Sequence, residues 1–98
     1  MLSATGASPE PLKLSPVLDL TAATPLKAEF GRLRGRPVRV DAADVDRVGA
    51  LCLQVLMSAH STWAAEGVPF SLGETSQAFD EGLATLGASF LLSSIPRE

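Results

Sequence analysis

Thiol catalysis requires a cysteine with a base within hydrogen-bond reach, and the chain has one cysteine, Cys52, and one histidine, His60. Both lie in a stretch with helical periodicity, where eight residues correspond to about 12 Å along the helix axis. That separation excludes a cysteine–histidine pair. Because no second histidine or cysteine lies at ligand spacing, a metal site at His60 is not expected either. We interpret Cys52 as a small core side chain, His60 as a partly buried residue at the core rim, and the chain as non-enzymatic.

Two charged clusters give weaker signals. Asp41, Asp44 and Asp46 could bind a divalent cation, but the other oxygen ligands and the shaping glycine of a calcium loop are missing, so turn and helix-start roles are favoured. Four arginines within eight residues could hold a phosphate or an acidic protein surface, or could be solvated residues at a helix end and a strand edge. They are Arg32, Arg34, Arg36 and Arg39.

Nucleic-acid binding is not expected, because the arginines lack interleaved aromatic residues and the chain carries a formal net charge of −3. No glycine-rich phosphate loop occurs, so we expect no cofactor. The 98 residues fit one domain with enough apolar residues for a core. A single cysteine suggests a reducing cytoplasm. The sequence shows neither a secretory signal over residues 1–15 nor an apolar run long enough to insert into a membrane.

The elements that position these residues follow from periodicity. Residues 1–11 are rich in serine, glycine and proline and predict a flexible N-terminal tail, followed by a single domain over residues 12–98. Residues 12–20 predict an extended segment interrupted by Pro16. A helix follows, with Thr21 or Thr24 as its cap and Pro25 in its first turn, and Gly35 ends it.

The second half alternates strands and helices. Residues 38–41 and 68–72 have the alternation of strands, and residues 49–66 form a long helix with one broad apolar face toward a sheet. Trp63 on that face is interpreted as a core anchor. Thr75 or Ser76 begins a shorter helix that ends at Gly87, and residues 89–95 are either a strand or a helical turn. The predicted fold is α/β, a small sheet of about four strands with helices packed on it.

Whole segments of this chain resemble the STAS domain of bacterial anti-sigma factor antagonists. The resemblance covers roughly residues 12–88 and is carried by Val17-Leu-Asp-Leu-Thr-Ala-Ala-Thr-Pro-Leu26, Val38-Arg-Val-Asp41, Val48-Gly-Ala-Leu-Cys-Leu-Gln-Val-Leu56 and Gly67-Val-Pro-Phe70, in that order. The clearest local similarity is between Leu18-Asp-Leu-Thr-Ala-Ala23 and the Glu-Leu-Asp-Leu-Ala-Thr-Ala start of the family.

The resemblance implies a docking site at the start of the long helix, where a family signature Asp-Ser-Ser-Gly-Leu carries the phosphorylated serine. Gly49-Ala-Leu-Cys-Leu53 aligns with that signature and retains only its final leucine, and Ala50 occupies the phosphoserine position without a hydroxyl. We therefore expect binding without phosphorylation at the usual site. The implied partner-binding residues are Asp44, Asp46, Arg47, Gly49, Ala50, Leu51 and Gln54.

Leu51 and Val55 lie off the apolar face of the long helix, so they either form an exposed patch or pack under the adjacent helix. The first functional hypothesis is a non-catalytic signalling module that binds a kinase-like, anti-sigma or chemotaxis protein. The alternative is an accessory subunit of a membrane lipid ABC transporter, since small STAS proteins also dock on transporter ATPases. An ATPase that co-purifies would favour the alternative.

Overall fold

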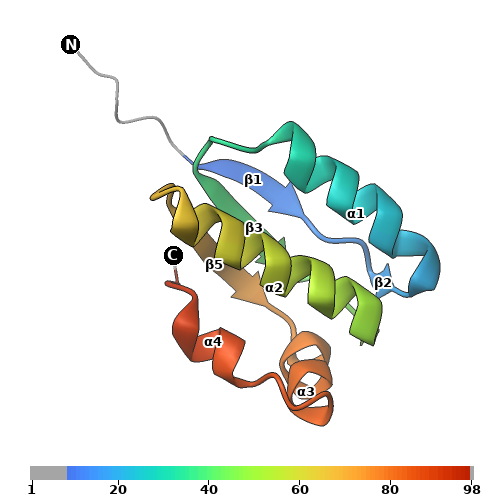
Figure 1. Ribbon diagram of the computed structural model, residues 1–98. Helices are drawn as coiled ribbons and strands as arrows, with labels where there is room; N and C mark the ends of the chain where they lie inside the picture. The colour runs from blue at the N-terminus through green and yellow to red at the C-terminus, as the bar shows by residue number, and fades with distance from the viewer. Residues whose placement is uncertain (1–8, 98) are drawn as a thin grey trace.

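The predicted alternation of strands and helices forms a parallel sheet with four helices packed on it in the computed structural model (Figure 1). The structure describes residues 9–97, so most of the expected flexible tail lies outside the described residues, while Glu10 and Pro11 already belong to the first strand. In chain order the elements are β1 (Glu10–Lys13), β2 (Val17–Leu18), α1 (Leu20–Arg32), β3 (Val38–Ala42), β4 (Arg47–Val48), α2 (Ala50–Ala65), β5 (Phe70–Thr75), α3 (Gln77–Thr85) and α4 (Phe90–Ser94).

The main sheet has the order β1-β3-β5, and its strands are all parallel. Val38 of the central strand is in register with Glu10 on one side and Phe70 on the other. Beyond β5, an isolated parallel bridge joins Leu72 of β5 to Arg97 near the end of the chain. The short strands β2 and β4 pair separately and in parallel. The two residues of β4 lie where the sequence predicted only a loop, because two residues are too few for a detectable alternation.

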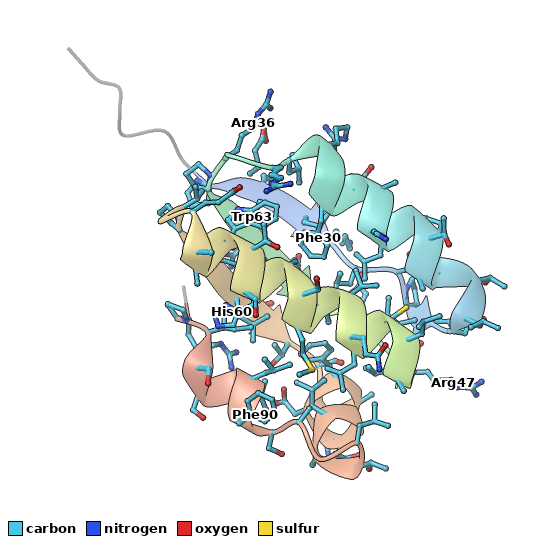
Figure 2. All side chains as sticks on the ribbon, in the orientation of Figure 1. Phe30, Arg36, Arg47, His60, Trp63 and Phe90 are labelled. Carbon is cyan, nitrogen blue, oxygen red and sulfur yellow. The ribbon has the colours of Figure 1, made fainter. Side chains whose placement is uncertain are left out.

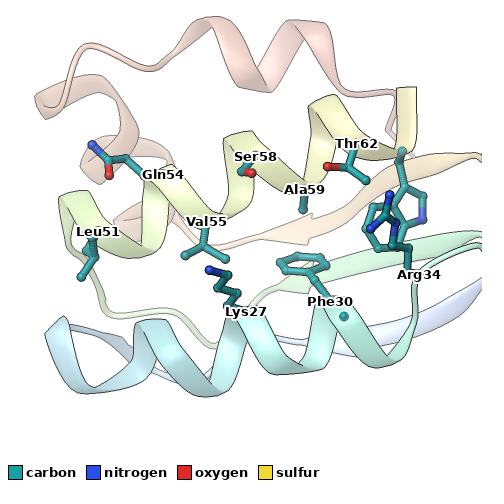
Figure 3. Close-up of a pocket in the computed structure, with 11 residues that line it drawn as sticks. Lys27, Phe30, Arg34, Leu51, Gln54, Val55, Ser58, Ala59 and Thr62 are labelled. Carbon is teal, nitrogen blue, oxygen red and sulfur yellow. The ribbon is translucent and has the colours of Figure 1, made fainter. Parts of the chain in front are cut away.

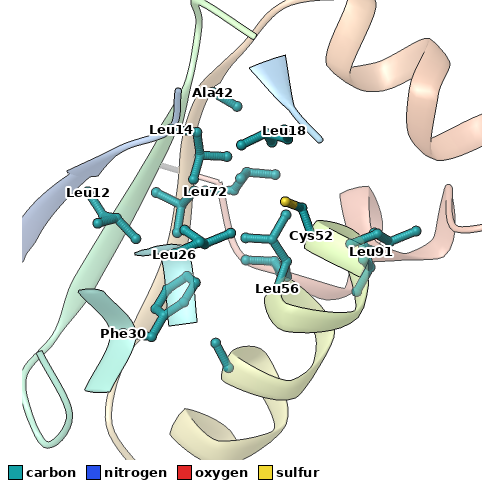
Figure 4. Close-up of a cluster of buried hydrophobic side chains, with 14 of the residues drawn as sticks. Leu12, Leu14, Leu18, Leu26, Phe30, Ala42, Cys52, Leu56, Leu72 and Leu91 are labelled. Carbon is teal, nitrogen blue, oxygen red and sulfur yellow. The ribbon is translucent and has the colours of Figure 1, made fainter. Parts of the chain in front are cut away.

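The core lies between the sheet and the helices (Figure 4). Val38, Val40 and Ala42 of β3 are fully buried, whereas Arg39 and Asp41, which point to the opposite face of the sheet, are only partly buried. This alternation is the period of a strand with one face packed under helices. Side chains from α2, α3 and α4 meet the sheet over β5, at Val40, Leu56, Phe70, Leu72, Phe79, Leu83, Leu91 and Ile95.

The start of α1 differs from the prediction. Asp19, and neither Thr21 nor Thr24, caps the helix, because its carboxylate accepts hydrogen bonds from the backbone N–H groups of Thr21 and Ala22 at 3.0 and 3.2 Å. The helix therefore begins at Leu20, and Pro25 lies inside it instead of in its first turn. A proline there cannot donate the usual backbone hydrogen bond, a cost that packing of the buried face must offset.

The other helix predictions are confirmed within one or two residues. The face of α2 that packs on the sheet contains Cys52, Leu53, Leu56, Ala59 and Trp63. The hydroxyl of Ser76 accepts a hydrogen bond from the Phe79 N–H at 3.0 Å and caps α3. Gly67 and Gly87 follow α2 and α3 with φ of 67° and 74°, the left-handed conformation that glycine adopts readily at helix ends. The C-terminal segment is the helix α4 followed by the bridge at Arg97.

Candidate functional site

The predicted site residues lie on the connection from β3 to α2 and on the first turns of α2. Asp44, Asp46 and Arg47 are exposed. Asp44 forms an ion pair with Lys13 of β1 at 2.8 Å, and the hydrogen bond and charge of Asp44 raise the pKa of the lysine. Asp44 is therefore engaged with the end of β1, while the connection itself is held by the residue before β2, since the backbone N–H of Asp46 donates to the Pro16 carbonyl at 2.7 Å.

The start of α2 is fixed against β2. The backbone N–H of Gly49 donates to the Leu18 carbonyl at 2.7 Å, and the Gly49 carbonyl accepts the first helical hydrogen bond from Leu53 at 3.1 Å. A Cβ atom on Gly49 would lie only 2.9 Å from the Leu18 carbonyl oxygen. A serine or aspartate cap at residue 49 would therefore crowd the Leu18 carbonyl oxygen. Ala50, the first residue of α2, is exposed.

The start of α1 lies beside the start of α2. The thiol of Cys52 on α2 donates to the carbonyl oxygen of Asp19, the cap of α1, at 3.3 Å. The hydroxyl of Thr21 donates to the Asp19 carboxylate at 2.7 Å and lowers the pKa of that carboxyl group. Burial raises the pKa of the Cys52 thiol, so it remains protonated as a donor. These bonds hold the two helix starts together at one end of the molecule.

Exposed apolar side chains gather at this end. Five large hydrophobic side chains are exposed within residues 9–97, and three of them belong to the segments just described: Val17 at 43%, Leu20 at 74% and Leu51 at 43% exposure. Val55, in contrast, is partly buried against the core. We define the helix-start surface as the three exposed hydrophobic residues together with the exposed predicted residues other than Asp44, which is paired with Lys13: Val17, Leu20, Asp46, Arg47, Ala50, Leu51 and Gln54.

The outward face of α2 has no charged side chain. The 16 residues of Ala50–Ala65 include no aspartate, glutamate, lysine or arginine. The exposed residues on this helix are Ala50, Leu51, Gln54, Ser58, Ser61, Ala64 and Ala65. A helix that faces water usually carries charged residues on its outer face, whereas interface cores are depleted of them.

Sequence reasoning missed part of this surface. Val17 and Leu20 were predicted to belong to one extended segment, whereas Leu20 is the first residue of α1, directly after the cap Asp19, and is exposed. The charge-free composition of α2 is a signal that the sequence does contain. Gly49, although predicted as a contact residue, is half-buried and fixes the backbone of the helix start.

Most of the remaining chemical candidates are buried or paired. Cys52 is fully buried, and the His60 ring lies 5.6 Å from the ring of Phe70, with a buried Nδ1 that has no hydrogen-bond partner (Figure 2). Arg32 pairs with Glu29 and Arg34 with Glu66, so two of the four clustered arginines are neutralised locally. The other two are Arg36, on the loop between α1 and β3, and Arg39, on β3.

Trp63 is a core anchor, as predicted, with 2% of its surface exposed and its indole N–H donating to the Arg36 carbonyl at 2.7 Å. Over residues 9–97, no three histidine, cysteine, aspartate or glutamate side chains lie close enough together to hold a metal ion. Among the helices in this range, none combines the length and the apolar character needed to cross a membrane.

Comparison with known protein families gives one result. A family model described as Mlab, STAS domain, matches residues 2–93. No curated protein and no solved structure gives a significant match to the chain.

Proposed function

The chain belongs to this family of STAS domains, which are regulatory protein-binding modules, and we propose that it docks on a protein partner through the helix-start surface. The interaction is proposed to be non-catalytic and cytoplasmic. The partner is proposed to be a kinase-like, anti-sigma or chemotaxis protein, and docking is proposed to proceed without phosphorylation of the usual position.

The observation that carries the proposal is the combination of a charge-free α2 with exposed Leu51 in its first turn, exposed Val17 on β2, which pairs with β4 just before α2, and exposed Leu20 at the start of α1. Burying an exposed leucine side chain against a partner contributes roughly 1.5–3 kcal/mol when it is fully covered. No charged side chain on α2 would have to lose its hydration. A protein surface is therefore a better complement for this helix than water is.

The proposed absence of a phosphorylation switch follows from the side chain of Ala50. A phosphate at the start of a helix would add about two negative charges to the docking surface. Ala50 is exposed but has no oxygen to phosphorylate, and its neighbour Gly49 supplies no hydroxyl either. Ser58 and Ser61, the exposed serines of α2, lie two to three turns further along the helix. Incubation with the cognate kinase and ATP should leave the protein without stoichiometric phosphate at Ser58 or Ser61.

Leu51→Asp tests the surface directly. Leu51 is 43% exposed, so the substitution should leave thermal stability within a few degrees of the parent while it places a charge in the interface. Leu86→Asp is a matched control, because Leu86 is 39% exposed and lies at the end of α3. With the partner that co-purifies from native cells, calorimetry should show at least tenfold weaker binding for Leu51→Asp only, roughly 1.4 kcal/mol. Equal affinities for the two variants would contradict the proposal.

Ala50→Glu tests the proposed reason for constitutive docking. A carboxylate in the first turn interacts favourably with the helix dipole, so the folded state should be unchanged or slightly more stable. The same charge imitates the missing phosphate and should weaken partner binding. Ala65→Glu, at the other end of α2, is the control for charge on this helix. Unchanged affinity for Ala50→Glu would show that this position lies outside the interface.

The transporter alternative is retained because the matching family model is described as Mlab and not as an anti-sigma factor antagonist. In this alternative the protein is an accessory subunit of a membrane lipid ABC transporter, and the same surface contacts the ATPase. Identification of the co-purified partner by mass spectrometry separates the two: an ABC-type ATPase supports the alternative, and an anti-sigma factor or kinase supports the first proposal.

A further inference from the structure

A groove of about 430 Å³ lies between α1 and α2 (Figure 3). Its floor is apolar and includes Phe30, Val55, Ala59 and Trp63. The rings of Phe30 and Trp63 meet edge to face with centroids 5.8 Å apart, which fixes the shape of the floor. Apolar hollows of this size, with a few polar groups at the rim, are typical of small-molecule sites.

Gly31 keeps the groove open. It lies in the last turn of α1 and lines the groove, and a Cβ atom at this position would meet nothing within 4 Å. Glycine within a helix is less stable than alanine by up to about 1 kcal/mol, because it loses more backbone entropy on folding. Packing inside residues 9–97 does not account for this glycine, since the space above it is empty. An occupant that lies over Gly31 would account for it.

The rim supplies one uncompensated positive charge. Arg34 is paired with Glu66 at 2.7 Å. Lys27 makes no ion pair with any described residue, and Figure 3 shows its ammonium group directed across the groove toward Val55. The α2 side of the rim is uncharged and polar, with Gln54, Ser58 and Thr62. The groove therefore combines an apolar floor with one free cation and several neutral hydrogen-bonding groups.

We propose that this groove binds a small amphipathic carboxylate, with the apolar part of the ligand over Gly31, Phe30 and Trp63 and its carboxylate at Lys27. A single free ammonium group matches a monoanion, and the hydroxyl and amide groups of the α2 rim can donate to the second carboxylate oxygen. Leu51 and Gln54 belong both to the groove and to the helix-start surface, so a ligand bound in the groove would affect the binding of a partner protein. Binding of the carboxylate requires no protein partner and is a function in addition to docking.

Octanoate is a suitable probe, and Trp63, the only tryptophan, is the reporter. Titration of the full chain with octanoate should produce a saturable change in tryptophan fluorescence with a dissociation constant of about 3 mM or tighter. Octanamide, which has the same chain without the charge, should bind more weakly. Butyrate should show no saturation, because it lacks most of the apolar surface.

Two variants test the geometry. Lys27→Gln should weaken octanoate binding about fivefold and leave octanamide binding unchanged, whereas Arg32→Gln removes one positive charge from the same helix outside the groove and should change neither. Gly31→Leu fills the groove and should abolish binding of both probes. Ala28→Leu adds the same side chain to an exposed position of α1 outside the groove and should not.

Four results would overturn the proposal. The first is a fluorescence signal that does not saturate up to about 30 mM octanoate, roughly ten times the expected dissociation constant. The second is octanoate binding that Lys27→Gln and Gly31→Leu do not affect. The third is concentration-dependent dimerisation that Gly31→Leu abolishes, which would assign the groove to a second copy of the chain. Loss of partner binding in Gly31→Leu without octanoate binding to the parent would assign it to the partner instead.

Discussion

Substituting glycine by alanine should change stability in opposite directions at two positions that both lie at the ends of helices. In Gly49→Ala the new Cβ lies 2.9 Å from the Leu18 carbonyl oxygen, closer than Cβ atoms approach backbone oxygens in native proteins. That carbonyl accepts the 2.7 Å hydrogen bond from Gly49 itself, so it cannot retreat without weakening the contact between β2 and α2. Crowding of this kind costs about 1–3 kcal/mol.

An effect of alanine on the unfolded chain reduces the destabilisation that crowding causes. Alanine lowers the conformational entropy of the unfolded chain and so stabilises the folded state by about 0.4–1 kcal/mol. The net loss in the free energy of unfolding for Gly49→Ala is therefore roughly 0.5–2 kcal/mol. For a domain of this size the melting temperature should fall by about 3–15 °C. Gly31→Ala meets open space and should gain about 0.4–1 kcal/mol, with a rise in Tm of a few degrees.

Thermal unfolding followed by circular dichroism, with urea titration at 25 °C, measures both variants. Gly49→Ser separates crowding from capping: its hydroxyl can cap α2, so it should be more stable than Gly49→Ala and still less stable than the parent. A Gly49→Ala protein as stable as Gly31→Ala would refute the close approach of β2 to the start of α2. It would also remove the explanation for an α2 that lacks a side-chain cap.

Two further predictions concern ionisable groups at the helix starts. Because the folded-state pKa of the Asp19 carboxyl is lowered, its contribution to stability is present above its unfolded pKa and is lost as the pH falls through the folded value. The melting temperature of the parent should therefore fall more steeply between about pH 5 and pH 2 than that of Asp19→Asn, which keeps an acceptor oxygen, and parallel pH profiles would contradict the cap. Cys52 is fully buried and its thiol pKa is raised, so a thiol reagent at pH 8 should modify it only in denaturant. Rapid labelling of the native protein would contradict its burial in the core at the start of α2.

The sequence predicted those parts of the fold that depend on long periodic segments. The alternation at residues 38–41 and the broad apolar face of the long helix identified β3 and α2, because side-chain periods of two and 3.6 are strong signals over such lengths. The predicted cap of α1 was wrong because Asp19, Thr21 and Thr24 are all residue types that cap helices, and the structure shows that the Asp19 carboxylate accepts the first backbone hydrogen bonds.

The candidate site was only partly accessible from sequence. Aligning the start of the long helix with the family signature singled out Ala50 and Leu51 as candidates, and the exposure of Leu51 removes one of the two alternatives for that residue. The contribution of Leu20 required the fold, because an exposed leucine cannot be distinguished from a buried one by its identity alone. The groove at Gly31 also required the fold, since its walls come from two helices that are separated by two strands in the chain.

Hydrogen–deuterium exchange of the protein with and without its co-purified partner tests the docking proposal most directly. Complex formation should slow exchange in the amides of residues 44–58 and of residues 17–22, the two segments that contain the helix-start surface, while the exchange of α3 and α4 stays unchanged. Protection confined to α3 and α4, or to the opposite face of the sheet at β1, would contradict docking through the start of α2.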